Sequence, residues 1–178
     1  MSMKKYLSKR NILYLFIIFL IGGLVGWFYE LIFYYFTEGR LTNRGILYGP
    51  ILPIYGLGAL GIYSLKPLKK NPIILFIACM LITGIVEYII GYISFNIFDT
   101  KLWDYTGLFL NINGIVCLRS VVSFAIGGLV FHYLIEENVY KLYNKISFKL
   151  VSNLCYIIMF FLIIDAIISH FYRTPITY

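Results

Sequence analysis

The stretch Val25-Gly26-Trp27-Phe28-Tyr29-Glu30 places a carboxylate inside an apolar run that covers residues 12–36. This run has roughly 25 residues, whereas about 20 apolar residues are enough for a helix to cross a bilayer. We therefore expect a tilted first transmembrane helix over residues 12–36. Because an ionisable group is costly in hydrocarbon, Glu30 is a candidate functional residue.

The composition of the whole chain indicates the same class of protein. Of the 178 residues, 61% are hydrophobic and 13% are charged, whereas soluble domains have roughly 45–50% apolar and about 25% charged residues. The sequence therefore predicts an all-α, polytopic transmembrane helix bundle in which residues 1–178 form a single transmembrane domain. The expected location is the cell membrane, as a multi-pass protein, and the expected partner is the lipid bilayer.

Four further apolar runs follow the first. They predict spans over about residues 45–65, 73–97, 114–134 and 150–172, five spans in all. Pro50 and Pro53 lie in the second run, and their missing N–H groups are expected to kink or break the outer half of that helix. Residues 136–149 carry apolar side chains at the spacing of one helical face, which predicts an amphipathic helix on the membrane surface.

The basic residues predict the orientation of these spans. If the five spans alternate in direction, 10 of the 15 Lys and Arg residues fall on the side of the N-terminus. By the positive-inside rule, the N-terminus is then cytoplasmic. Since topology accounts for the net charge of +7, no nucleic-acid partner is expected. The ten residues are Lys4, Lys5, Lys9, Arg10, Lys66, Lys69, Lys70, Lys141, Lys145 and Lys149.

The order of features along the chain indicates a parallel repeat of two hairpins, followed by the fifth span. Residues 26–61 and 84–128 each contain a glycine, an intramembrane glutamate (Glu30 or Glu87), an aromatic polar loop and an Asn shortly before Gly-Ile. The first and third spans cross in the same direction. Parallel repeats of this kind occur in transporters.

Four ionisable residues are expected at similar depth. With a rise of about 1.5 Å per residue, Glu30, Glu87, Asp165 and Arg119 lie about 10, 15, 10 and 6 Å from the outer ends of their spans. We therefore expect a polar pocket that opens outward, with Arg119 paired to Glu30 or Glu87. The alternative is that these acids only hold helices together.

The sequence gives no sign of a metal site or a cofactor. Cys79, Cys117 and Cys155 lie in apolar runs without ligand spacing, which is typical of small buried side chains. His132 and His170 lie near opposite ends of spans, and we predict that both are interfacial. The sequence contains no P-loop and no nucleophile motif, so the enzyme class is the weaker prediction.

Several motifs resemble one family of membrane proteins. They are Trp27-Phe28-Tyr29-Glu30, residues 43–56, Glu87, residues 102–105 and residues 111–114. These motifs are similar to those of the CmpB-type, or ABC-transporter type IV, membrane proteins, over about residues 12–145. The resemblance implies a bacterial plasma-membrane transport component of the permease kind.

The resemblance also implies a set of site residues. Loops around Asn43-Arg44 and Trp103-Asp104-Tyr105 are expected to cover the outer pocket. The chain departs from the family at Ile115, where the resemblance predicts an arginine, so Arg119 is the nearby cation, four residues further along the same helical face. Together with Arg119 and Asp165, the candidates are Glu30, Asn43, Arg44, Tyr48, Tyr55, Glu87, Trp103, Asp104, Tyr105 and Asn113.

Three functions are consistent with these patterns. The first is a transport component with a polar site in the outer half of the bilayer, which could form a homo-oligomer and be energised by a separate cytoplasmic ATPase subunit. The second is a membrane-embedded enzyme that acts on lipid or cell-envelope substrates, with Glu30 or Glu87 as the general acid or base and Arg119 or Arg44 holding an anionic head group. The third is a structural or assembly subunit. The first is the function that we predict.

Overall fold

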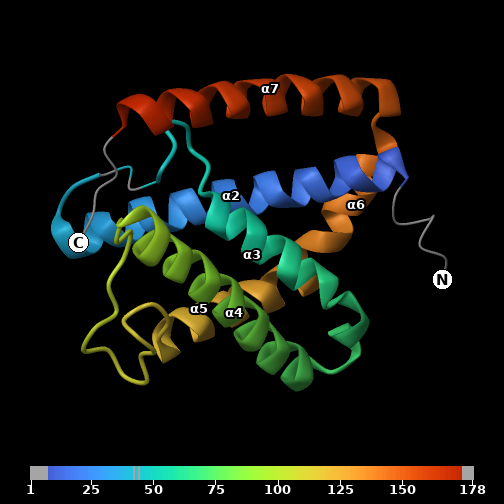
Figure 1. Ribbon diagram of the computed structural model, residues 1–178. Helices are drawn as coiled ribbons and strands as arrows, with labels where there is room; N and C mark the ends of the chain where they lie inside the picture. The colour runs from blue at the N-terminus through green and yellow to red at the C-terminus, as the bar shows by residue number, and fades with distance from the viewer. Residues whose placement is uncertain (1–7, 42, 44, 174–178) are drawn as a thin grey trace.

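The computed structural model describes residues 8–41, 43 and 45–173, and it confirms that the chain is all-α (Figure 1). These residues contain no β-strand apart from an isolated bridge between Ile112 and Val116. A 3₁₀ turn, η1 (Lys66–Lys70), precedes α4, and a π-helical segment, η2 (Phe131–Ile135), joins α5 to α6. The helices are α2 (Lys9–Glu38), α3 (Pro53–Ser64), α4 (Pro72–Phe98), α5 (Leu118–Val130), α6 (Glu136–Lys145) and α7 (Phe148–Tyr172).

Four helical segments in the described part of the chain are long and apolar enough to cross a membrane. They are α2, α4, the continuous helix Leu118–Lys145 and α7. This finding confirms that the chain is a membrane protein of helical type. The second predicted span differs, because only 12 of its residues are helical, in α3.

The break in this second span lies where the prolines predict it. Residues 45–52 are not helical, and α3 begins at Pro53. A proline fits the first turn of a helix because its missing N–H would have no intrahelical partner there. The backbone N–H of Leu52 instead donates to the carbonyl of Gly23 in α2, at 3.1 Å. The non-helical segment is therefore held against α2.

The fourth predicted span and the predicted surface helix also have different bounds in the structure. α5 begins at Leu118 rather than 114, because Gly114 has a left-handed backbone (φ 69°) and the Ile112–Val116 bridge closes a turn. The predicted surface helix 136–149 is only helical to Lys145 as α6, and it continues directly from η2.

Consecutive helices pack against each other from α2 to α5, and α7 lies along α2 (Figure 1). α2, α4 and α7 run in one direction in this view, and α3 and α5 run in the other. Glycines allow α2 and α3 to approach closely. A Cβ added at Gly22 would lie 2.4 Å from the Ala59 Cβ. One added at Gly26 would meet the Tyr55 ring at 2.1 Å.

The core contains buried side chains from each helix from α2 to α7. Ile18, Leu75 and Ala125 are fully buried there. Cys79, Cys117 and Cys155 are free and buried, as predicted. Much of the remaining apolar surface is exposed along the helices, which is typical of side chains that face lipid.

Candidate functional site

Glu87 is a buried acid in the middle of α4. Only 3% of the residue's surface is exposed. One carboxyl oxygen, Oε1, accepts a hydrogen bond from the Tyr105 hydroxyl at 3.0 Å. The other, Oε2, accepts one from Ser120 Oγ at 2.8 Å. Both carboxyl oxygens of Glu87 therefore accept a hydrogen bond, one from the 99–117 connection and one from α5.

Glu30 has a matching partner in the first hairpin. Its Oε1 accepts a hydrogen bond from the Tyr55 hydroxyl at 3.1 Å. The Tyr55 ring comes from α3 and packs against Phe124 of α5, with ring centroids 5.1 Å apart. In both hairpins, then, a glutamate on the long helix is bound by a tyrosine from the segment that follows it.

One cavity connects the surroundings of the two acids. Its volume is about 280 Å³, and residues of α2, α3 and α5 line it. Glu30, Tyr55 and Tyr105 line it directly, and Glu87 lies behind the Tyr105 hydroxyl that it binds. The depths estimated from the sequence predicted that the two glutamates lie near each other. They gave no information on Tyr55 and Tyr105, which were candidates only because of the family resemblance.

The predicted ion pair of Arg119 is wrong. Among the described residues, Arg119 makes no ion pair with Glu30 or Glu87. Its side chain is exposed, and its guanidinium lies over the Phe33 ring, 5.7 Å from the centroid. This is a cation–π arrangement. Arg119 nevertheless lines the same cavity.

Asp165 does not belong to this cluster. Its carboxylate accepts hydrogen bonds from the backbone N–H of Tyr48 at 3.0 Å and of Gly49 at 2.9 Å. Ser169 Oγ donates to the same carboxylate at 2.9 Å. The acid therefore joins α7 to the non-helical segment 45–52. Similar depth did not place it near Glu30, because depth says nothing about which side of the bundle a residue faces.

Two other candidates hold the segment 45–52 in place. Asn43 Oδ1 accepts from Trp27 Nε1 at 3.1 Å and from the Gly45 N–H at 3.1 Å. The hydroxyl of Tyr48 donates to the Tyr172 carbonyl at 3.2 Å. Neither side chain lines the cavity. Arg44 lies outside the described residues.

The remaining candidates shape the 99–117 connection. Trp103 Nε1 donates to the Ile115 carbonyl at 2.7 Å. Asn113 Nδ2 donates to the Tyr88 hydroxyl at 3.0 Å. Asp104 pairs with Lys101 at 2.7 Å and accepts from the Thr106 N–H at 2.7 Å. Lys101 and Thr106 lower the pKa of Asp104 to about 2. Of this connection, only Tyr105 lines the cavity.

A buried polar cluster at the other end of the bundle was not predicted. His132 is fully buried rather than interfacial, and so is Glu136, at 1% exposure. His132 Nε2 lies 2.8 Å from the Ile62 carbonyl and must donate to it, whereas Nδ1 lies 2.8 Å from Glu136 Oε2. One proton therefore lies between Nδ1 and the carboxyl.

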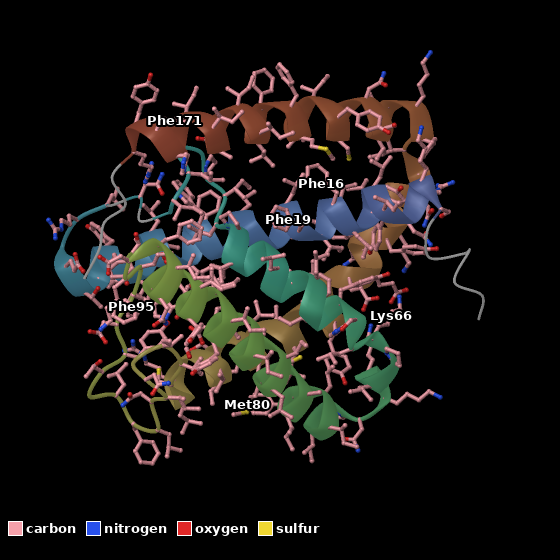
Figure 2. All side chains as sticks on the ribbon, viewed as in Figure 1. Phe16, Phe19, Lys66, Met80, Phe95 and Phe171 are labelled. Carbon is pink, nitrogen blue, oxygen red and sulfur yellow. The ribbon has the colours of Figure 1, made fainter. Side chains whose placement is uncertain are left out.

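Lys66 completes this cluster. Its ammonium lies 2.5 Å from Glu136 Oε1, and the acid raises the pKa of Lys66. Figure 2 shows Lys66 at the opposite end of the bundle from Phe95 and Phe171. The spacing of His132 and Glu136, four residues apart, was the signal that could have revealed the pair. His170, in contrast, is exposed.

No group of three or more metal-ligating side chains occurs within the ranges that the structure describes. The polar groups at the cavity are carboxyl, hydroxyl and guanidinium groups. They can hydrogen-bond or pair with a polar solute at membrane depth.

The fold defines a helical membrane protein, with a cavity between its helices that polar side chains line in part. The chain belongs to the family described as "Putative ABC-transporter type IV", whose model matches residues 17–170. The resemblance inferred from the motifs is therefore confirmed, and the match also includes most of α7, beyond the motifs. Neither the curated proteins nor the solved structures contain a match to the chain.

Proposed function

We propose that the chain is the membrane-embedded component of a bacterial plasma-membrane transporter and acts as its permease. It binds a solute in the cavity that Glu30, Tyr55, Tyr105 and Arg119 line. The observation that carries this proposal is the pair of glutamates, each bound by a tyrosine hydroxyl, at one cavity between apolar helices. Polar groups at membrane depth typically mark a solute or ion path.

The arrangement of the two hairpins supports a parallel repeat. α2 and α4 run in one direction, and each is followed by a non-helical segment and a shorter helix, α3 or α5 (Figure 1). Transporters with such repeats bind substrate at the interface between the repeats. In this chain, the non-helical segment and α3 together take the place of the second of five crossings.

The distribution of charge supports a cytoplasmic N-terminus. Eight described Lys and Arg residues lie at the end of the bundle where α2 begins, and four lie toward the other end. The positive-inside rule places the first group in the cytoplasm. Its members are Lys9, Arg10, Lys66, Lys69, Lys70, Lys141, Lys145 and Lys149. A separate ATPase subunit would bind this side, and oligomerisation would occur within the membrane.

The proposal is tested with membrane vesicles that contain the wild-type chain and are loaded with an extract of small metabolites. Mass spectrometry then reports which solutes leave or accumulate, with and without ATP and the proteins of the producing cell. We expect at least one solute to redistribute with the wild type and with Glu137→Gln, an exposed control. We expect Glu87→Gln and Tyr105→Phe to abolish this redistribution.

If no solute redistributes under any of these conditions, or if Glu87→Gln and Tyr105→Phe behave as the wild type does, the cavity is not a transport site.

A further inference from the structure

The cavity has a long apolar part beyond its polar end. On α2 its wall is a stripe at helical spacing, from Phe33 through Tyr29 and Val25 to Ile21. This stripe spans 12 residues, which is about 18 Å at 1.5 Å per residue. One leaflet of a bilayer core measures about 15 Å, half of its 30 Å thickness. The groove is therefore long enough for a chain that lies in one leaflet.

The groove opens toward the bilayer rather than toward water. Val25 and Tyr29 on one rim, and Val130 on the other, are exposed in the middle of helices long enough to span a membrane. Side chains exposed at this depth face acyl chains. A molecule that enters the groove from the side therefore comes from the lipid phase.

Two glycines leave room within the groove. Gly58 on α3 and Gly127 on α5 both line it, and a Cβ at either would meet no atom within 4 Å. By contrast, the glycines at the α2–α3 contact, such as Gly22, leave no such room. The absence of side chains at positions 58 and 127 therefore keeps the groove open rather than allowing helices to pack.

One charge at the polar end is available to a ligand. Glu30 is hydrogen-bonded by Tyr55, and Glu87 is covered by Tyr105 and Ser120. Arg119, at the first turn of α5, is exposed, and among the described residues it forms no ion pair. A guanidinium over an aromatic ring can still bind a phosphate or carboxylate with its outer N–H groups.

We propose that the groove binds one apolar chain of an amphiphile whose anionic head group binds Arg119. The head group lies at the end of the groove that Glu30 and Phe33 line, and the apolar chain runs along α2 toward Ile21. This inference rests on the proposed function and names its substrate class, a single-chain or lipid-like anion that enters from the bilayer.

The test is binding to the purified chain in nanodiscs of zwitterionic lipid. The probe is a lysophospholipid with a 16-carbon chain and an anionic phosphoglycerol head, and native mass spectrometry counts the bound molecules. We expect one molecule to bind. Arg119→Gln should weaken binding about tenfold or more, because a charge-assisted hydrogen bond is worth about 1.5–3 kcal/mol. Gly58→Leu should weaken it similarly by filling the groove.

Matched controls separate these effects from general ones. Arg40→Gln removes the same charge from an exposed side chain outside the groove. Ala166→Leu places the same leucine side chain on the exposed surface of α7. Both variants should bind the probe as the wild type does. Thermal unfolding of each variant confirms that it is folded, and Gly127→Leu repeats the filling test from the opposite wall.

Three results would overturn the inference. The first is that inorganic phosphate competes with the probe at equal concentration, which indicates a site for a soluble anion. The second is equal binding of a neutral monoacylglycerol, which excludes a role for the head group at Arg119. The third is that Gly58→Leu and Gly127→Leu leave binding unchanged. If only water-soluble solutes redistribute in the vesicle assay and the probe does not bind, the inference fails and the proposed function stands.

Discussion

Two adjacent glutamates of α6 provide a sharp test of how the structure assigns burial. Glu136 is buried and lies 2.8 Å from His132 and 2.5 Å from Lys66. Glu137 is exposed and pairs at 2.8 Å with Lys141, whose side chain is also exposed. In the sequence the two residues are adjacent glutamates, and the sequence alone does not distinguish their burial. The structure predicts opposite results when each is replaced by alanine.

The expected loss in the free energy of unfolding depends on which groups remain without a partner after the substitution. Glu136→Ala removes the partner of a fully buried His132, and breaking a buried pair in this way costs about 3–5 kcal/mol. The lower average of about 0.6 kcal/mol for hydrogen bonds between membrane helices is less suitable here, because the pair carries charge or a shared proton. For a chain of this size, about 2–4 °C per kcal/mol gives a fall in Tm of about 6–20 °C.

The assay is thermal unfolding of both variants in the same detergent, followed by near-UV circular dichroism. Glu137→Ala should leave Tm unchanged, because an exposed ion pair contributes little. The double variant His132→Leu/Glu136→Leu should recover much of the loss, since it removes both polar partners together. Equal Tm values for Glu136→Ala and Glu137→Ala would refute the buried cluster.

Three further predictions concern the contacts around the cavity. Asp165→Ala removes the acceptor of two backbone N–H groups, so amide exchange in residues 45–52 should rise at least tenfold, as hydrogen-exchange mass spectrometry reports; unchanged exchange would contradict the assignment. Gly26→Ala should destabilise the fold by about 1–3 kcal/mol through overpacking against Tyr55. Gly127→Ala should instead stabilise the fold by about 0.5–1 kcal/mol, because its Cβ would enter open space. Thermal unfolding measures both changes, and a change of the same sign in both variants would refute this assignment of close and open contacts. Because the pKa of Asp104 is lowered from 3.8 to about 2, the order of its loop should persist above pH 4 and be lost as the pH falls toward 2, and Asp104→Asn should remove this pH dependence from amide exchange.

Local chemistry allowed a large part of the fold to be predicted. A long apolar run predicts a membrane helix because backbone groups in lipid must bond within the helix. Pro50 and Pro53 predicted the break before α3 because a proline lacks the donor that a helix interior needs. Gly22 and Gly26 act through equally local chemistry, because a residue without a Cβ lets two helices approach closely.

The sites depend on which side of each helix faces the bundle, and this information is not local. Successive residues on a helix are about 100° apart, so Glu136 can be buried while Glu137 is exposed. The π-helical segment η2 changes the register just before them. Depth placed Asp165 beside Glu30, yet it faces the segment 45–52. Arg119 was expected beside an acid, and it lies instead on the Phe33 ring.

The most direct test of the central claim compares transport and stability in the variant Glu30→Gln. Glutamine keeps an oxygen that accepts the Tyr55 hydroxyl, so the free energy of unfolding should change by less than about 1 kcal/mol. Redistribution of the solute found with wild-type vesicles should fall at least tenfold. If redistribution is unchanged, or if unfolding is destabilised by about 3–5 kcal/mol as expected for a broken buried pair, Glu30 is a structural residue and the cavity is not the solute site.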